Sequence, residues 1–169
     1  MLRNFLPNLY LGSIYQLQAN KLKQKGIDTI LIDLDNTLVT HVAEVPEPAL
    51  STWIVKMKAA GFKMIIISNN TKRRVSRWAN KLCLPYIHLA RKPFRSSFKQ
   101  ALGILNSAPH QAAVMGDQLC TDILGGNRMM LFTILVKPLS ATDSWPTRLN
   151  RYIEKIVVSY LLRKTNKVS

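Results

Sequence analysis

The sequence predicts an α/β fold in which a parallel, doubly wound sheet is covered by helices on both faces. Short runs of strand-forming apolar residues alternate along the chain with longer segments whose apolar residues recur at helical spacing. The apolar runs are almost continuous, as expected for strands that are buried on both faces. Turn residues, many of them glycine or proline, separate the segments. This alternation of strands and helices is typical of a parallel sheet.

The first half of the chain contains two predicted helices, each followed by a predicted strand. The first helix is indicated by three apolar residues at helical spacing, Ile14, Leu17 and Leu22. Gly26 ends this helix as a C-cap. Pro46 and Pro48 open the second helix, and Gly61 ends it. The two strands are the apolar runs 27–34 and 62–68.

The second half continues the same alternation. Thr71 caps a basic helix that extends to Leu82. Two further helices are predicted at about 96–106 and at 119–124. Three further strands are predicted at 86–89, 112–116 and 130–136. The sheet is therefore expected to contain about five strands.

Length and composition indicate one domain without a membrane span. A chain of 169 residues that is 47% hydrophobic can bury one substantial core, so residues 1–169 are expected to form a single domain. No apolar run reaches the roughly 20 residues that a spanning helix needs. Polar residues interrupt the N-terminal apolar residues, which argues against a cleavable signal peptide. Cys83 and Cys120 form no close pair, so neither a disulfide framework nor a zinc site is expected, and the predicted location is cytoplasmic.

The charge of the chain is strongly positive and unevenly distributed. The sequence contains 24 Lys and Arg against 9 Asp and Glu, a net charge of +15. Between Glu47 and Asp117 there are 12 basic residues and no acidic one. Such a surface attracts anions, whether phosphate esters, anionic lipid head groups or nucleic acid. The alternative is a general solubility charge without a specific partner.

Two carboxylates follow the first predicted strand. Asp33 and Asp35 are two positions apart, and alternate positions on a strand share a face, so both carboxyl groups can point into one small volume. Two carboxylates that lie so close repel each other, and burial raises the cost. A bound divalent cation is the expected compensation.

Polar residues also follow the other predicted strands. Ser68 and Asn69 follow the second strand, Lys92 follows the third, and Asp117 ends the fourth, with Asp122 five residues on. In doubly wound sheets, ligands bind beyond the carboxyl ends of the strands. Together these groups suit a phosphate and a hard cation that prefers oxygen ligands.

Each of these residues alone has an ordinary structural explanation. It could form a turn, cap a helix or lie in solvent on the surface. Four successive strand ends that place such residues at one edge of the sheet favour a shared site over four separate coincidences.

The ordered motifs resemble those of the HAD (haloacid dehalogenase-like) superfamily of phosphotransferases. The four matching motifs are Asp33-Leu34-Asp35-Asn36-Thr37, Ser68, Lys92 and Gly116-Asp117-x4-Asp122. More narrowly, three runs resemble the YqeG-type group of subclass IIIA: Ser68-Asn69-Asn70, Gly116-Asp117-Gln118-Leu119 and Gly125-Gly126-Asn127-Arg128. That group is related to mitochondrial phosphatidylglycerophosphatase. The resemblance implies a HAD-like Rossmannoid fold.

The resemblance also implies a Mg²⁺-dependent phosphomonoester hydrolase that works through an aspartyl-phosphate. Asp33 would be the nucleophile, and Asp35 would donate and then accept the proton. Mg²⁺ would lie between Asp33, the backbone carbonyl of Asp35 and Asp117. Asp122 would support the metal directly or through water.

The remaining predicted site residues would bind the phosphate. Ser68 and Asn69 would hold phosphoryl oxygens, and Lys92 would neutralise both the phosphate and the nucleophile. Only 33 positions separate Asp35 from Ser68, and 24 separate Ser68 from Lys92. Each interval holds about one helix, so no cap domain is expected. An open site would admit large substrates or head groups in a bilayer.

The substrate and partners are less well determined. The resemblance favours a phospholipid phosphate such as phosphatidylglycerophosphate, and a soluble sugar or nucleotide phosphate is the alternative. Residues 143–169 are predicted to form a basic amphipathic helix and tail. This segment could lie on an anionic membrane, which would place the protein peripherally on the inner membrane face. It could equally pack on its own domain or on a second protomer, which leaves a homo-oligomer open.

A second class of function is a basic module that binds RNA or a ribonucleoprotein and has little turnover. The helix from Thr71 to Leu82, with its basic residues and Trp78, would be the binding surface. The support for this hypothesis is only electrostatic.

Overall fold

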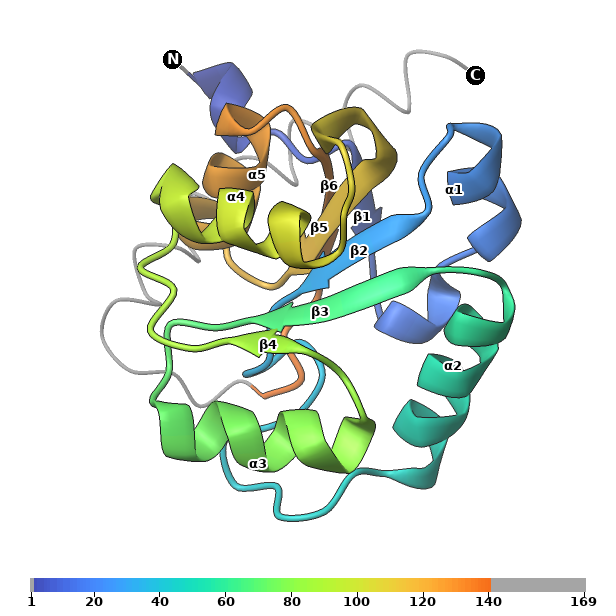
Figure 1. Cartoon of the computed structure of the whole chain (residues 1–169), viewed down its shortest axis with the longest axis vertical. Helices are drawn as coiled ribbons and strands as arrows, with labels where there is room; N and C mark the ends of the chain where they lie inside the picture. Colours follow the sequence, from blue (N-terminus) through green and yellow to red (C-terminus); the bar gives the residue numbers. More distant parts are fainter. Residues whose placement is uncertain (1, 141–169) are drawn as a thin grey trace.

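The computed structural model describes residues 2–140, which form a sheet with helices on both faces (Figure 1). Six parallel strands pair in the order β1-β6-β5-β2-β3-β4. The strands are β1 (Leu9–Leu11), β2 (Thr29–Ile32), β3 (Lys63–Ile67), β4 (Tyr86–Ile87), β5 (Ala112–Gly116) and β6 (Phe132–Val136). The helices are α1 (Ala19–Gln24), α2 (Pro48–Ala59), α3 (Lys72–Leu82), α4 (Arg95–Ile104) and α5 (Leu124–Arg128). This architecture confirms the predicted parallel, doubly wound fold.

Short helical segments complete the chain. Three are 3₁₀ turns, η1 (Leu2–Phe5), η2 (Ile14–Gln16) and η3 (Pro109–Gln111), and one is the π-helical segment η4 (Leu119–Ile123). Within residues 2–140, no helix combines the length and the apolar character needed to cross a bilayer. The predicted helix and tail at 143–169 lie outside the described residues, and a single domain over 1–169 stays a prediction.

The strand order changes direction at the centre of the sheet. From β2 the chain adds β3 and β4 on one side, and it then adds β5 and β6 on the other side. In the register of the central strands, Ile30 lies opposite Met64 on β3 and Ala113 on β5. The ends of β2 and β5 therefore form the switch point of the sheet, where ligands bind in doubly wound folds.

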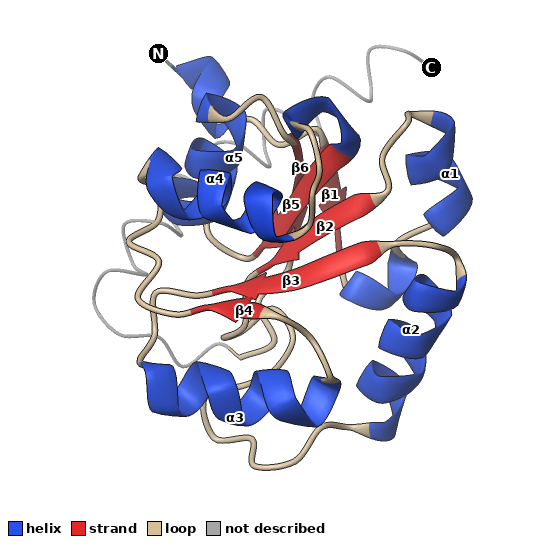
Figure 2. Cartoon of the chain, viewed as in Figure 1, coloured by secondary structure: helices blue, strands red, loops and turns tan. Residues whose placement is uncertain are grey.

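The two helical layers cover opposite faces of the sheet (Figure 2). On β2, Ile30 and Ile32 belong to the core beneath α1, α2 and α3, whereas Leu31 belongs to the core beneath α4. All three side chains are fully buried. Burial on both faces explains why the central strands are continuous apolar runs. Each such side chain contributes about 1.5–3 kcal/mol to the free energy of folding.

One strand was not predicted. β1 is only three residues long and partly exposed, and its run of Leu-Tyr-Leu is too short to show a strand period in the sequence. It is held by parallel pairing with β6, in which Leu9 lies opposite Ile134. Asn8 strengthens this pairing, because its Oδ1 accepts hydrogen bonds from the backbone N (2.7 Å) and from Oγ1 (3.0 Å) of Thr133.

Other elements differ from the prediction at their ends. The first predicted helix is divided, because Ile14–Gln16 forms a 3₁₀ turn before α1. The predicted strand 86–89 ends at Ile87, and Leu89 adopts a left-handed conformation with φ 46°. The predicted helix 119–124 begins as the π-helical segment and continues through α5 to Arg128.

The segments between the motifs hold no additional domain. Between Asp35 and Ser68 lie a loop, α2 and β3, and between Ser68 and Lys92 lie α3 and β4. The prediction that the fold has no cap domain is confirmed for these segments.

Candidate active site

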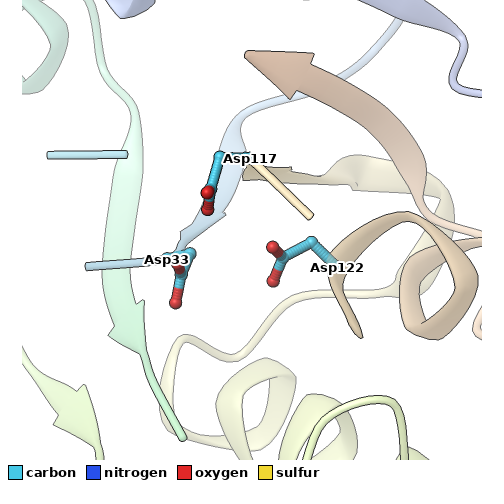
Figure 3. Close-up of side chains that lie close together, drawn as sticks. All are labelled: Asp33, Asp117 and Asp122. Carbon is cyan, nitrogen blue, oxygen red and sulfur yellow. The ribbon is translucent and has the colours of Figure 1, made fainter. Parts of the chain in front are cut away.

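Three aspartates meet where the strand order reverses (Figure 3). Asp33 follows β2, Asp117 follows the adjacent β5, and Asp122 comes from the π-helical segment. One carboxylate oxygen of each residue lies within 4.8 Å of the others. All three residues are buried, with exposed fractions of 6%, 4% and 0%. We call this group the aspartate cluster.

A glycine makes room for Asp122. A Cβ atom at Gly116, the last residue of β5, would overlap with Oδ2 of Asp122, far inside contact distance. The same oxygen accepts a hydrogen bond from the backbone N of Gln118 (3.2 Å). Only glycine at position 116 therefore lets Asp122 pack against the end of the strand.

Lys92 joins two members of the aspartate cluster. Its Nζ donates to Oδ1 of Asp33 (2.7 Å) and to Oδ1 of Asp122 (2.6 Å). Burial acts to lower the pKa of Lys92, but attraction to Asp122 and Asp33 and hydrogen bonds to both outweigh it, so the pKa lies above its usual range. Lys92 is therefore a permanent cation inside the site.

The carboxyl groups of the cluster resist ionisation. Burial raises the pKa of Asp33 to about 7, with Lys92 opposing the shift and Asp122 adding to it. Burial also raises the pKa of Asp117 to about 9, and the nearby Asp33 and Asp122 add to this shift. Burial is the main cause of both shifts, and repulsion among the carboxyl groups of the cluster adds to it.

The cluster has the composition of a divalent-cation site. Three carboxylates and one lysine leave two excess negative charges when all are ionised. Carboxylate oxygens are the ligands that Mg²⁺ prefers, and a bound cation would offset the repulsion among the carboxylates that adds to the two pKa shifts. The residues present therefore fit a hard divalent cation.

Comparison with known proteins places the chain in a family. A family model described as HAD-hydrolase-like matches residues 89–155. The chain is 41% identical over 160 residues to "Probable phosphatase YqeG" of Bacillus subtilis (strain 168), an alignment that covers 95% of this chain and 93% of that protein. The chain belongs to the YqeG family of HAD-like phosphatases. The resemblance inferred from the motifs is confirmed.

More distant similarities agree with this family. The YqeG-family chain is 26% identical over 172 residues to "Phosphatidylglycerophosphate phosphatase 1, chloroplastic/mitochondrial" of Arabidopsis thaliana. That alignment covers 94% of this chain but 49% of the Arabidopsis protein, so the chain spans about half the length of this relative.

Two solved structures share the fold. The cobalt-bound deoxy-D-mannose-octulosonate 8-phosphate phosphatase of Haemophilus influenzae superposes with a TM-score of 0.55 at 12% identity, covering 68% of this chain and 70% of that one. An uncharacterized protein from Listeria monocytogenes serotype 4b superposes with a TM-score of 0.57 at 20% identity, covering 70% and 85%. At these identities the similarity shows the fold alone.

In this YqeG-family site, Asn69 holds the backbone of Lys92. Its Oδ1 accepts from the backbone N of Lys92 (2.7 Å), and its Nδ2 donates to the backbone O of Lys92 (3.2 Å). Both polar atoms of the side chain are thus engaged by the lysine. The assignment of Asn69 as a phosphate ligand stays a prediction, and the structure gives its side chain a positioning contact that the sequence did not indicate.

Ser68 lies buried at the end of β3. Its Oγ accepts a hydrogen bond from the backbone N of Asn70 (3.1 Å), and its own backbone N donates to Ile87 O on β4 (2.9 Å). The side chain is 2% exposed. The role of Ser68 in binding phosphate stays a prediction.

The carboxylate of Asp35 lies outside the aspartate cluster. Its Oδ1 accepts from Nε of Arg74 (2.6 Å), and its Oδ2 accepts from Nδ2 of Asn70 (3.0 Å). Nδ1 of His41 lies 3.5 Å from Oδ1. Its carboxylate is held by these donors and not by the cluster, and the use of its backbone carbonyl as a metal ligand stays a prediction.

Arg74 and Thr37 were missed as site residues. Thr37 donates from Oγ1 to Oδ1 of Asp117 (3.2 Å), and its place in the first motif was the available signal. Arg74 also donates to the backbone oxygens of Thr40 (3.0 Å) and His41 (3.1 Å). It stands among several basic residues of α3, and nothing in the local pattern separates it from them.

The predicted RNA-binding face of α3 is partly wrong. Trp78 is 1% exposed and packs in the core, so it cannot stack on a base. Arg77 and Lys81 both donate to the backbone oxygen of Glu44, and Arg74 binds Asp35. These basic side chains hold the loop after β2 against α3, although Arg77 and Lys81 remain exposed.

Proposed function

We propose that the chain is a Mg²⁺-dependent phosphomonoester hydrolase that forms an aspartyl-phosphate on Asp33. The observation that carries the proposal is the buried aspartate cluster with Lys92 beside it, which is two positive charges short of neutrality. A structural ion pair does not need three carboxylates around one lysine. A site that holds a divalent cation next to an anionic phosphate needs the additional carboxylates as metal ligands.

The first step would be attack by Asp33. One of its oxygens, Oδ1, is bonded to Lys92. The other would form a bond to phosphorus while the bond from phosphorus to the ester oxygen breaks. A divalent cation held by Asp33, Asp117 and Asp122 would shield the anionic nucleophile from the anionic phosphate. Lys92 would offset negative charge on the phosphoryl oxygens as the transfer proceeds.

Asp35 would carry the protons. It would donate one to the departing ester oxygen and take one from the water that attacks the aspartyl-phosphate. That water would release inorganic phosphate and restore the carboxylate of Asp33. The contacts with Arg74 and Asn70 would keep the Asp35 carboxylate apart from the metal ligands, so that it remains available for proton transfer.

The proposal is tested by metal removal. We expect the purified chain to release phosphate from p-nitrophenyl phosphate in Mg²⁺. In excess EDTA the rate should fall about 10²-fold or more, because the unshielded cluster would repel the substrate. Excess Mg²⁺ should restore the rate. A rate that persists in EDTA would contradict the metal site, and the absence of turnover on every phosphate ester would contradict the proposed activity.

Arg74 offers a second test, because it would position Asp35. We expect Arg74→Ala to lower kcat about 10- to 100-fold with a change in KM of less than about threefold, since a displaced proton donor affects the chemical step more than binding. Arg74→Lys should recover part of kcat. Steady-state kinetics on p-nitrophenyl phosphate measure both constants.

A matched control is Arg77→Ala. Arg77 lies one turn further along α3 and binds the same loop through Glu44 O, but the contacts of the described residues do not link it to Asp35. It should retain kcat within about twofold. An equal loss of kcat in both alanine variants would mean that Arg74 acts only by holding the loop.

For the substrate, we propose a phospholipid phosphate of the phosphatidylglycerophosphate type. Support comes from the function named for the Arabidopsis relative, from the positive charge of the chain and from a site without a cap domain. A soluble sugar or nucleotide phosphate is the alternative. A panel that includes phosphatidylglycerophosphate in vesicles separates them, and comparable rates on short soluble phosphates would contradict the lipid proposal.

A further inference from the structure

Apolar side chains are exposed in two loops at the same edge of the sheet as the aspartate cluster. Val42, Leu89 and Phe94 have exposed fractions of 87%, 58% and 66%. Val42 lies in the loop after β2, and the other two lie in the loop after β4, so all three belong to the carboxyl edge of the sheet. We call these three residues the apolar rim.

Hydrogen bonds join the loops that carry the apolar rim. The backbone N of Leu89 donates to Asn70 O (3.0 Å), and the Asn70 side chain in turn donates to Asp35. Arg74 binds the backbone oxygen of His41, the residue before Val42. The rim residues are therefore attached to the same framework that holds the candidate catalytic groups.

The backbone of the second loop is unusual for the residues that it carries. Leu89 and Arg91 both adopt left-handed conformations, with φ of 46° and 52°. A large L-residue rarely adopts this conformation, and strained positions of this kind concentrate at functional sites. At Leu89 the strain leaves an apolar side chain in solvent, where it gains little from packing within the chain.

Exposed basic residues lie at the same edge of the sheet as the apolar rim. Arg91 lies between the two rim residues of the second loop, and Lys72 and Arg73 lie in the first turn of α3. The sequence holds no acidic residue between Glu47 and Asp117, so the loop after β4 and the first turn of α3 carry basic charge alone, whereas the loop that carries Val42 also holds the exposed Glu44 and Glu47. Around Leu89 and Phe94, apolar side chains combined with Lys and Arg, without acids between them, suit the boundary between head groups and acyl chains of an anionic bilayer.

We propose that the apolar rim and its neighbouring basic residues dock the enzyme on the surface of an anionic phospholipid bilayer. The inference rests on the proposed phosphatase function and deepens it by naming the surface on which the substrate is met. Docking in this orientation turns the entrance of the open site toward the head groups. A phosphate monoester in the bilayer then reaches Lys92 and Asp33 without leaving the membrane.

The experiment is co-sedimentation of the full chain with vesicles of phosphatidylcholine, with and without phosphatidylglycerol. A rim variant combines Val42→Ser, Leu89→Asn and Phe94→Ser. Asparagine tolerates the left-handed conformation, and serine is a good N-cap at position 94, where α4 begins, so the variant should fold. A matched control variant replaces three exposed apolar residues away from the rim, Val55, Ile104 and Met130, by serine.

We expect the unmodified chain and the control variant to bind vesicles that contain phosphatidylglycerol with affinities within about twofold of each other. The rim variant should lose about tenfold or more in affinity, because three apolar anchors are removed. All three proteins should hydrolyse p-nitrophenyl phosphate at similar rates, since rim residues touch no catalytic group in the described part of the chain.

The outcomes separate the two proposals. Equal binding by the rim variant and the control would overturn the docking proposal, as would equal binding to vesicles without phosphatidylglycerol. Loss of binding to RNA or to a protein, with vesicle binding unchanged in the rim variant, would overturn it in favour of a different partner. Vesicle binding without turnover of any phosphate ester would leave the docking surface in place and refute the phosphatase function.

Discussion

Asp33→Asn is expected to lower the rate of phosphate release about 10³-fold or more, while leaving the fold at least as stable as before. Asparagine has the size of aspartate and can still accept the hydrogen bond from Lys92 through its Oδ1. It cannot form the bond to phosphorus that the proposed mechanism needs. The measurement is the rate of phosphate release in Mg²⁺, together with trapping of an acyl phosphate by hydroxylamine in the unmodified chain.

The stability of this variant should change with pH in a defined direction. Because burial raises the pKa of Asp33 to about 7, the folded chain keeps a proton there that the unfolded chain has already lost. The unmodified chain in EDTA therefore loses stability as pH rises from about 4 to about 7, and the asparagine variant avoids this loss. We expect the Tm of the variant to exceed that of the unmodified chain by roughly 2–6 °C at about pH 8 and to match it at about pH 4.

Asp28→Asn is the matched control, because Asp28 immediately precedes the same strand at its other end. Its Oδ1 accepts a hydrogen bond from Oγ1 of Thr29 (2.8 Å), which an asparagine can also accept. It should keep full activity. Retained activity in Asp33→Asn would remove Asp33 from the role of nucleophile, whatever the stability data show.

Lys92→Met is expected to have the largest effect on stability. Its Nζ is the cation between Asp33 and Asp122, and both carboxyl groups are buried. Removing this cation leaves both buried carboxyl groups without a positive partner, which costs about 3–5 kcal/mol of unfolding free energy, whereas Asp33→Asn leaves Lys92 paired with Asp122. For a chain of this size we expect the Tm in EDTA to fall by about 10 °C at about pH 8. Phosphate release should also be lost, because the charge opposite the phosphate is gone.

The loss should be smaller in acid. Lys92 lowers the pKa of Asp33, so removing the lysine raises that pKa further above its unfolded value. A carboxyl group of this kind destabilises the fold increasingly as pH rises through the window between its two pKa values. Urea unfolding in EDTA at about pH 5 and at about pH 8 measures the difference.

Lys99→Met provides the comparison, because Lys99 is exposed on α4. It should change the unfolding free energy by less than about 0.5 kcal/mol at either pH. Equal losses for Lys92→Met in acid and in base would mean that the lysine acts through packing and not through its charge.

The positions of the site motifs could be predicted because they follow from the burial of the apolar runs that form the strands. β5 was predicted at residues 112–116, and the structure has the same bounds. Once an apolar run is buried on both faces of a parallel sheet, the first polar residue after it emerges at the carboxyl edge. Asp33 and Asp117 meet for this reason, since β2 and β5 are neighbours at the switch point.

Contacts between distant parts of the chain were not predictable from these patterns. β1 depends on Asn8 and Thr133, which are 125 positions apart. The orientation of the Asp35 carboxylate depends on Arg74, 39 positions away. The periodic spacing of apolar residues predicts which face of a helix or strand is buried. It does not predict which polar groups from distant segments that element will contact.

The sequence alone determined the parallel sheet, the edge that holds the site and the residue types gathered there, because periodic burial of apolar residues sets all three. Only the tertiary structure decided which of these polar groups pair with one another. In the structure, Lys92 binds Asp33 and Asp122, and Arg74 binds Asp35. The side chain of Asn69 binds the backbone of Lys92. These pairings depend on distances of a few ångströms between segments far apart in sequence, and the hydrogen bonds and charges at those distances decide them.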